Sequence, residues 1–182
     1  MTFVGHHAPS AGFDSPFDML EACHERVRRM LTLLTRLEQH LHQHGCDHQA
    51  RQAAVDVMRY FDQAAPLHHQ DEELHVFPLL LESADPSLHA VVQTLLEQHK
   101  SMEQIWARLR SVLQDLSRCE DGQSFTGLPA GEVQAFSELY AQHIRLEEHI
   151  VYPKARAALT PEGLRVIGED MMTRRGVKPV VW

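Results

Sequence analysis

Apolar residues recur every three or four positions along the first long segment of the chain, which is the spacing of one face of an α-helix. The apolar positions of this stripe are Leu20, Val27, Leu31, Leu34, Leu37 and Leu41. Ser15 and Pro16 precede the stripe as an N-cap residue and a first helical residue, and Gly45 follows it as a C-terminal stop. The pattern therefore predicts a helix over residues 16–44.

The same signals predict three further long helices and one short helix. The second helix begins at Asp47 and runs to about residue 83, with a bend expected at Pro66 and a second one at Pro78. The remaining helices are predicted over residues 86–117, 131–159 and 161–175, with a loop over residues 119–130. The chain shows no alternating pattern typical of a β-strand.

Long amphipathic helices joined by short connections favour neighbours that run in opposite directions. We therefore predict an all-α fold, an antiparallel up-down four-helix bundle with a short extra helix at the C-terminal end. The expected organisation is a flexible lead-in over residues 1–14, the bundle over residues 15–159, and the short helix with a tail over residues 160–182.

Composition narrows the classes of partner. The chain has 17 Lys and Arg against 25 Asp and Glu, a formal net charge of −8, which disfavours a nucleic-acid partner because such proteins present a basic face. The apolar runs are too short to span a membrane, and the first residues do not resemble a signal peptide. Three dispersed cysteines without a CxxC motif favour a reducing compartment. We expect a cytoplasmic protein without a membrane partner, and a homodimer is left open.

An internal repeat with an offset of 75 residues relates the two halves of the chain. The corresponding polar pairs are His24 and His99, His68 and His143, Glu72 and Glu147, and Glu73 and Glu148, and Pro78 corresponds to Pro153. Apolar positions of the helical stripes repeat with the same offset. Two helical hairpins related in this way would bring four histidines and two glutamates to one level of the bundle core.

The residue types at these positions point to metal chemistry. His68 and Glu72 are four residues apart, as are His143 and Glu147, so each pair shares one helix face. Burying a glutamate without a cation is costly. Imidazole and carboxylate ligands together suit a pair of iron ions, and also manganese or zinc. The predicted ligands are His24, His68, Glu72, His99, His143 and Glu147.

One other register was weighed against this one. His69 and Glu73 are also four residues apart, on a stripe rotated by about 100°. The second half keeps the second glutamate but has Ile144 where His69 would correspond. We therefore choose the His68 and Glu72 register and keep His69 with Glu73 as the alternative.

A ferritin-like arrangement is a further alternative, because such proteins use Glu-x-x-His motifs on two helices. The strings Glu21-x-x-His24 and Glu72-x-x-His75 fit this motif. The repeat places Leu96 opposite Glu21, which disfavours a symmetric site of this kind.

Three residues near the predicted ligands are candidates for additional ligands or for hydrogen bonds to ligands. Glu103 and Tyr140 each lie one helical turn from a predicted ligand, and His75 lies three residues after the first predicted glutamate. For Glu103 and His75 the simpler interpretations are a solvated side chain and a partly buried histidine paired with a neighbour. Tyr140, together with Met102 and Trp106, is placed to line a small-molecule pocket or simply to pack in the core.

The whole pattern resembles a hemerythrin-like (HHE cation-binding) domain of the bacterial type over about residues 15–157. The motifs that carry the resemblance are the lone His24 and His99, His68-x3-Glu72-Glu73 before Phe77-Pro78, and His143-x3-Glu147-Glu148 before Tyr152-Pro153. The resemblance implies a four-helix bundle that holds two iron ions. His24 and His68 would bind one iron, His99 and His143 the other, and Glu72 and Glu147 would bridge them.

The departures from the oxygen-carrying hemerythrins bear on function. Those proteins have a fifth histidine where this chain has Glu103, and a His-x4-Asp motif where this chain has His143-x3-Glu147. Reversible oxygen carriage is therefore not expected. The resemblance implies a non-haem di-iron protein that binds or senses a small oxidant or gas, such as dioxygen or nitric oxide, or iron or redox state. The alternative is a di-iron enzyme that reduces peroxide or nitric oxide, or an iron donor in stress repair of iron centres.

Overall fold

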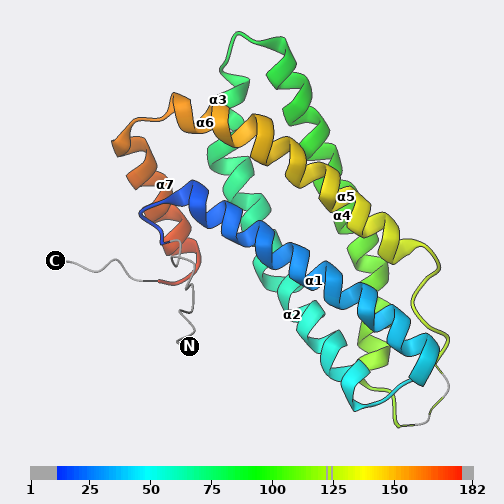
Figure 1. Ribbon diagram of the computed structural model, residues 1–182. Helices are drawn as coiled ribbons and strands as arrows, with labels where there is room; N and C mark the ends of the chain where they lie inside the picture. Colours follow the sequence, from blue (N-terminus) through cyan, green and yellow to red (C-terminus); the bar gives the residue numbers. More distant parts are fainter. Residues whose placement is uncertain (1–11, 122, 124, 178–182) are drawn as a thin grey trace, which may run out of the picture.

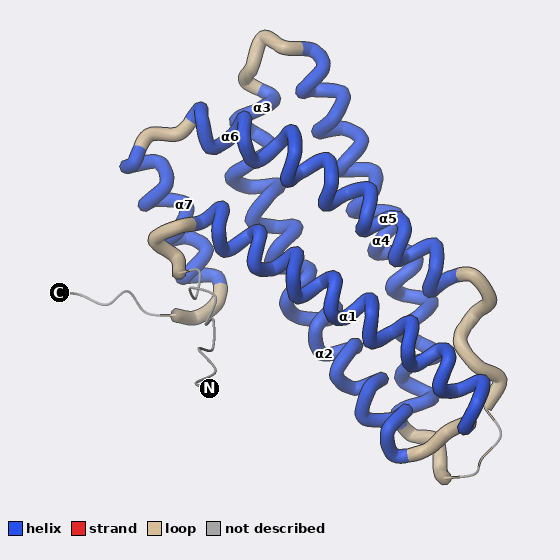
Figure 2. The backbone as a smooth tube through the Cα atoms, viewed as in Figure 1, coloured by secondary structure: helices blue, strands red, loops and turns tan. Residues whose placement is uncertain are grey.

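The computed structural model describes residues 12–121, 123 and 125–177. Over these residues every regular element is helical (Figure 2), which confirms the all-α prediction. The elements are α1 (Pro16–His44), α2 (His48–Asp71), the π-helical turn η1 (Glu72–Val76), α3 (Phe77–Leu81), α4 (Pro86–Ser117), α5 (Glu132–Leu146), the π-helical turn η2 (Glu147–Val151), α6 (Tyr152–Ala158) and α7 (Pro161–Arg174). Most of the expected lead-in, residues 1–11, and the end of the tail, residues 178–182, lie outside this description.

Four long helical segments pack side by side. α1 packs against α2 and α5, and α4 packs against the same two helices, so the four surround a common core. Figure 1 shows that α3 continues the line of α2 and α6 continues the line of α5 at one end of the molecule, where α7 also lies. The shared core of these four segments is the place where the repeat predicts the polar residues to meet.

The helix starts follow the capping residues of the sequence. The Asp47 side chain accepts a hydrogen bond from the Ala50 N–H at 2.8 Å, and Asp85 and Thr160 cap α4 and α7 in the same manner. Ser15 occupies the N-cap of α1 but its side chain makes no capping bond, so Pro16 alone marks that start. α2 continues through Pro66 as one helix.

The irregularity in the second and fourth segments lies at the predicted glutamates instead. The Phe77 N–H bonds the carbonyl of Glu72 and the Tyr152 N–H bonds the carbonyl of Glu147, so each helix widens by one residue there. A proline follows each wide turn, and proline lacks the N–H that would continue the α-helical ladder. π-helical turns of this kind occur often at functional sites. The repeat thus includes a backbone feature that the sequence analysis did not anticipate.

Two apolar clusters make up the core, and they occupy different lengths of the bundle. One contains Val27, Leu34, Val57 and Phe136, among others, and the other contains the buried residues of α3, α6 and α7 together with Leu20 and the early part of α4. Along α1 and along α4, the predicted histidine lies between a residue of one cluster and a residue of the other. The polar residues therefore form a layer between two apolar regions.

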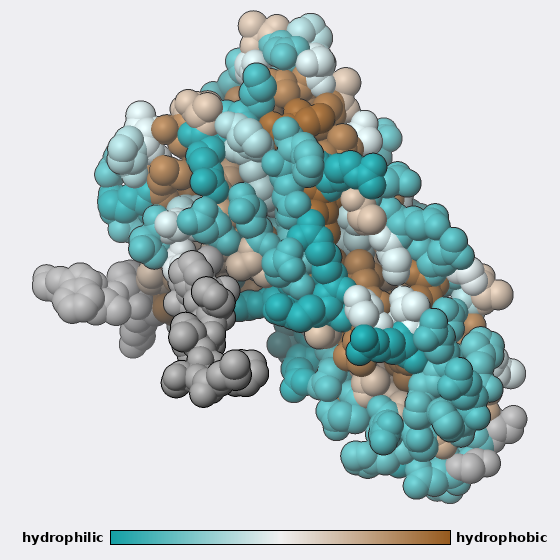
Figure 3. Space-filling model, in the orientation of Figure 1, coloured by the Kyte–Doolittle hydropathy of each residue, from teal (hydrophilic) through white to brown (hydrophobic). Residues whose placement is uncertain are grey.

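The outer surface gives no sign of a membrane segment. Among the residues described, no helix combines the length and the apolar character needed to cross a bilayer. The face shown in Figure 3 is mainly hydrophilic, with apolar patches separated by polar residues.

Candidate metal centre

The structure brings the six predicted ligands together in the layer between the apolar clusters. Each comes from a different element: the histidines from α1, α2, α4 and α5, and the glutamates from the first positions of η1 and η2. All are buried, with at most 2% of any residue exposed, and they are His24, His68, Glu72, His99, His143 and Glu147. Burial of this many polar side chains requires partners, because an unpaired buried polar group is costly.

The six residues fall into two overlapping groups of four. His24 and His68 form one group with Glu72 and Glu147, and His99 and His143 form the other with the same two glutamates. Within each group the potential ligand atoms lie within 4.8 Å of one another. Two carboxylates shared between two pairs of imidazoles is the grouping that the resemblance implies.

All four imidazoles face the shared carboxylates with the same ring nitrogen. The Nε2 atoms of His24 and His143 lie 3.1 and 3.0 Å from Glu147 oxygens. The Nε2 atoms of His68 and His99 lie 3.3 and 3.5 Å from Glu72 oxygens. Within the second group the Nε2 atoms of His99 and His143 are 3.1 Å apart. This convergence of nitrogen and oxygen donors is typical of a metal site.

Several donor atoms of the layer have no hydrogen-bond partner among the described residues. They include Oε2 of Glu72 and both carboxylate oxygens of Glu147. A buried carboxylate is normally hydrogen-bonded or paired with a cation. The nitrogen and oxygen donors match the preference of iron, manganese and zinc ions. The residues present therefore fit a group of cations at this layer.

The comparisons with known proteins agree with this geometry. The family description "Hemerythrin HHE cation binding domain" matches residues 15–155. The chain belongs to the hemerythrin HHE domain family. It is also 32% identical over 168 residues to an uncharacterized protein of Haemophilus influenzae, covering 92% of this chain and 94% of that one. Membership in the family implies that the chain binds a metal ion, typically iron, and the two groups of four could hold it.

In this hemerythrin HHE domain, three of the histidines also have a partner for Nδ1, the ring nitrogen on the outer side of the layer. The Nδ1 atom of His24 lies 3.0 Å from Oε1 of Glu148, and that of His99 lies 2.7 Å from Oε1 of Glu73. Each of these carboxylates therefore serves a histidine of the other hairpin. The Nδ1 atom of His143 lies 2.9 Å from Oε1 of Gln98. Such contacts fix the ring orientation and the tautomer that a metal-binding histidine needs.

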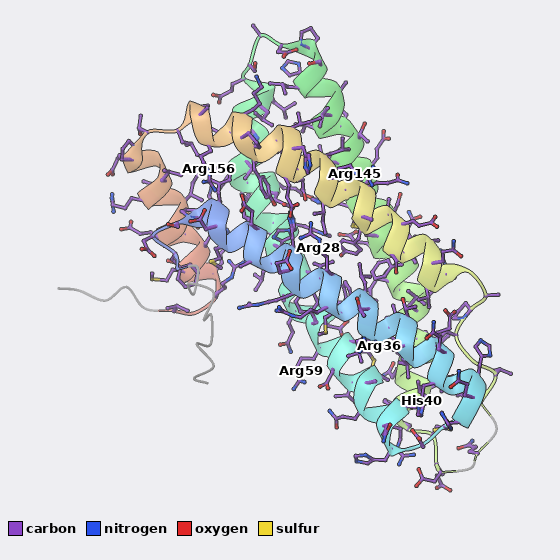
Figure 4. All side chains as sticks on the ribbon, viewed as in Figure 1. Arg28, Arg36, His40, Arg59, Arg145 and Arg156 are labelled. Atoms are coloured by element: carbon purple, nitrogen blue, oxygen red, sulfur yellow. The ribbon has the colours of Figure 1, made fainter. Side chains whose placement is uncertain are left out.

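Arg28 secures the outer contact of His24. Its Nη2 donates to both oxygens of Glu148, at 2.9 and 2.8 Å, from a position midway along α1 (Figure 4). The guanidinium lowers the pKa of Glu148 against the effect of burial, so this carboxylate stays charged. A charged acceptor keeps the proton of His24 on Nδ1 and leaves Nε2 free to face the centre.

Burial and the carboxylates compete in setting the charge of the layer. Burial, assisted by the neighbouring histidines, outweighs the opposing effect of Glu72 and lowers the pKa of His68 to about 3, so this imidazole is neutral. Burial also opposes the charge of His99, but Glu72 and Glu73 outweigh it and raise the pKa of His99 to about 9. Burial raises the pKa of Glu147, but His143 and His24 outweigh it and leave the pKa below its ordinary value. The carboxylates are thus anionic and attract positive charge to the layer.

Tyr152 enters the layer and breaks its two-fold symmetry. Its hydroxyl donates to Oε1 of Glu72 at 2.5 Å and lies 3.2 Å from Nε2 of His24, on which its ring stacks with centroids 5.5 Å apart. The corresponding residue of the other half is Phe77, which stacks on His99 with centroids 5.7 Å apart and has no hydroxyl. Of these two corresponding residues, the one with a hydroxyl therefore lies on the His24 side.

The three additional candidates lie outside the two groups of four. His75 contacts Asp170 of α7, with 2.7 Å between Nε2 and Oδ2, so it is the partly buried histidine paired with a neighbour that was the simpler interpretation. Glu103 is exposed and lines a cavity next to the centre. Tyr140 is buried and lines the same cavity together with Met102 and Trp106, the alternative given for it from the sequence.

The two rival registers are also placed by the structure. His69 is buried but stacks on His99 with centroids 3.9 Å apart, and Glu73 contacts the outer nitrogen of His99. Glu21 is exposed and forms an ion pair with Arg156 at 3.6 Å. The residues that distinguish these two alternatives all lie outside the two groups, and they are His69, Glu73, Glu21 and His75.

Sequence reasoning missed the outer contacts and Tyr152. The signal for the outer contacts was present, because both halves repeat a second glutamate directly after the first. Tyr152 could have been noticed as the residue before Pro153, at the position where the first half has Phe77. Assigning partners to these residues required the packing of one hairpin on the other.

Proposed function

We propose that the layer holds two iron ions in an antiparallel four-helix bundle of the hemerythrin type. His24 and His68 would bind one ion, His99 and His143 the other, and Glu72 and Glu147 would bind both. The single observation that carries this proposal is the pair of overlapping groups that share the two glutamates. Manganese or zinc would suit the same donors, so the identity of the ion is a matter for experiment.

The proposed role is to bind or sense a small oxidant or gas, such as dioxygen or nitric oxide. Two imidazoles and two shared carboxylates per ion leave coordination positions for a small ligand, and iron in such a site supplies redox chemistry. The protein contributes a buried layer that excludes water, which strengthens electrostatic interactions with a bound ligand. The contacts of three outer nitrogens, those of His24, His99 and His143, keep these imidazoles in place while the charge of the centre changes.

A second candidate, the reduction of peroxide or nitric oxide, is favoured by Tyr152. Its hydroxyl lies beside the glutamate and histidine of one side only, where it can hold or deliver a proton. A general acid on one side of a dinuclear centre suits a reaction that releases water. An iron-donor role is less well supported, because the proposed ligands are buried to at least 98%.

The cellular setting is also a proposal. All three cysteines are free and buried, which suits a reducing cytoplasm.

Rapid mixing tests the proposed function. The iron-loaded, reduced protein is mixed separately with dioxygen, nitric oxide and hydrogen peroxide, and the visible absorption is followed in time. A binder or sensor forms a defined adduct with one of these at a stoichiometry of one per chain. An enzyme consumes peroxide or nitric oxide repeatedly when a reductant is supplied, and the Tyr152→Phe variant slows turnover more than adduct formation. Absence of any reaction with all three would contradict both candidates.

A further inference from the structure

A cavity of about 240 Å³ lies next to the metal layer, between α2, α4 and α5. Three aromatic rings make up much of its wall: Phe61, Trp106 and Tyr140. Their centroids lie close together, with 5.0 Å between Phe61 and Trp106 and 5.8 Å between Phe61 and Tyr140. The volume is well above what a diatomic gas fills and below that of a drug-sized site. It suits an organic molecule of about eight to ten non-hydrogen atoms.

The carboxylates of the cavity lining make it negatively charged. Its lining includes the carboxylates of Glu73 and Glu103 and contains neither lysine nor arginine. The indole N–H of Trp106 donates to Asp62 at 3.0 Å, and Asp62 in turn accepts from Arg110 at 2.8 Å. The indole is therefore held in place by a contact that does not use the cavity. Aromatic faces beside carboxylates attract cations and repel anions.

One residue of the cavity lining also has a buried polar atom without a partner. His69 lines the cavity, is 8% exposed, and its Nε2 has no hydrogen-bond partner among the residues described. Its ring stacks on His99 with the planes 12° apart. A buried, unsatisfied ring nitrogen is uncommon in native structures and indicates a missing partner.

We propose that this cavity binds a small organic cation, an ammonium group attached to an aromatic or branched aliphatic body. The hydrocarbon body lies against Phe61, Trp106 and Tyr140, and the ammonium is balanced by Glu103 and Glu73. Cation–π attraction to the rings and charge attraction to the carboxylates act on the same group. Anionic ligands of the same size are rejected because the lining offers no basic side chain.

Occupancy of the cavity is coupled to the metal layer through Glu73, a step that rests on the proposed function. Oε1 of Glu73 lies 2.7 Å from Nδ1 of His99, so an ammonium that shares this carboxylate weakens its contact with the histidine. The bound cation would therefore change the environment of the ion held by His99 and His143. The other ion site, where Glu148 contacts the outer nitrogen of His24, has no such connection to the cavity, because Glu148 does not line it.

Fluorine NMR on the full-length chain labelled with 5-fluorotryptophan tests the binding directly. The chain has two tryptophans, Trp106 and Trp182, and the resonance that is lost in the Trp106→Phe variant is assigned to Trp106. The protein is titrated with benzylammonium, with benzyl alcohol as the neutral probe of similar size, and with benzoate as the anion. We expect a saturable shift of the Trp106 resonance with benzylammonium, at least about threefold weaker binding of benzyl alcohol, and none of benzoate.

A matched pair of variants separates the cavity carboxylate from general surface charge. Glu103→Gln should weaken benzylammonium binding at least about threefold and leave benzyl alcohol unchanged. Glu97→Gln removes an exposed carboxylate of the same helix outside the cavity and should have no effect. Equal affinity for the ammonium and the alcohol, no shift with either probe, or an unchanged Glu103→Gln variant would overturn the proposal.

The effect of the bound cation on the metal layer is measured separately from its binding to the cavity. In the iron-loaded protein, benzylammonium should change the visible absorption with the same concentration dependence as the Trp106 shift. A Trp106 shift without any change in absorption would refute the coupling alone. A shift in a chain that takes up no metal would leave the cavity proposal standing and contradict the proposed function.

Discussion

Glu147 and Glu148 are neighbours in the sequence, and the structure predicts very different consequences of replacing them. Glu147 is fully buried, belongs to both groups of four, and lies 3.0 to 3.1 Å from two imidazoles. Glu148 has a 24% exposed side chain and contacts only the outer nitrogen of His24 and Arg28. Glu147→Gln therefore removes a charge from both proposed ion sites, whereas Glu148→Gln loosens the support of one.

The expected magnitudes follow from these positions. A charge pair about 4 Å apart is worth about 4 kcal/mol at an effective dielectric constant of about 20, so the loss of the Glu147 charge should weaken metal binding by about a thousandfold or more. Loss of an outer contact such as that of Glu148 typically costs about 10- to 100-fold. Glu73→Gln, the counterpart of Glu148→Gln in the repeat, should show a similar loss at the ion nearer His99.

Competition with a chromophoric chelator under anaerobic conditions measures these affinities. Glu138→Gln is the control, because Glu138 is an exposed residue of α5 that contacts only Gln134 among the hydrogen bonds of the described chain. Circular dichroism checks that each variant folds. A loss for Glu148→Gln equal to or larger than that for Glu147→Gln would refute the assignment of the two glutamates.

Two further predictions concern stability and pH. Arg174, the last residue of α7, and Arg175, which follows it, donate to the buried Asp71 at 2.5 and 2.6 Å. Replacing both with alanine leaves an unpaired buried carboxylate and should cost about 3–5 kcal/mol in urea unfolding of the metal-free protein. Arg165→Ala breaks only exposed ion pairs of α7 and should change the free energy of unfolding by less than about 1 kcal/mol. If this variant and the double arginine variant lost equal stability, the proposed contribution of the Asp71 ion pairs would be refuted. Because the pKa of His99 is raised to about 9, its proton stabilises the metal-free fold fully below pH 6.5, and this contribution is lost as the pH rises to about 9. Over the same interval metal displaces that proton more easily, so affinity should rise by up to about tenfold per pH unit, and a pH-independent affinity in chelator competition would contradict this reasoning.

The ligand layer was predictable from the sequence because each proposed ligand lies on the apolar stripe of its own helix. The His-x3-Glu spacing fixes the shared face within a helix. The repeat then identifies which residues of the two hairpins correspond, and Ile144 decides the register by its place opposite His69. Helical periodicity likewise predicted every long helix to within a few residues at its ends.

The failures have a common physical origin in the π-helical turns. In an α-helix His75 would share the face of Glu72, but the widened turn that begins at Glu72 rotates the following residues away from it. The same widening lets Tyr152, which follows the second turn, face the layer, where its hydroxyl donates to Glu72. No local sequence period reports such a turn, because it depends on the packing of the helix against its neighbours.

Residue spacing along a helix could not predict the contacts between the two hairpins for a related reason. Glu73 and Glu148 each contact a histidine of the other hairpin, and Arg174 contacts Asp71 from a helix at the C-terminal end. Such partners are separated by 26 to 124 positions in the sequence, so only the packed arrangement brings them together.

Mössbauer spectroscopy of the chain loaded with ⁵⁷Fe tests the central claim most directly. It reports how much iron each chain holds and whether two ions share bridging ligands. The account predicts about two irons per chain that, once oxidised, form a magnetically coupled pair with a diamagnetic ground state. One iron per chain, or ferric ions that behave as isolated paramagnetic centres, would contradict a dinuclear centre shared by Glu72 and Glu147.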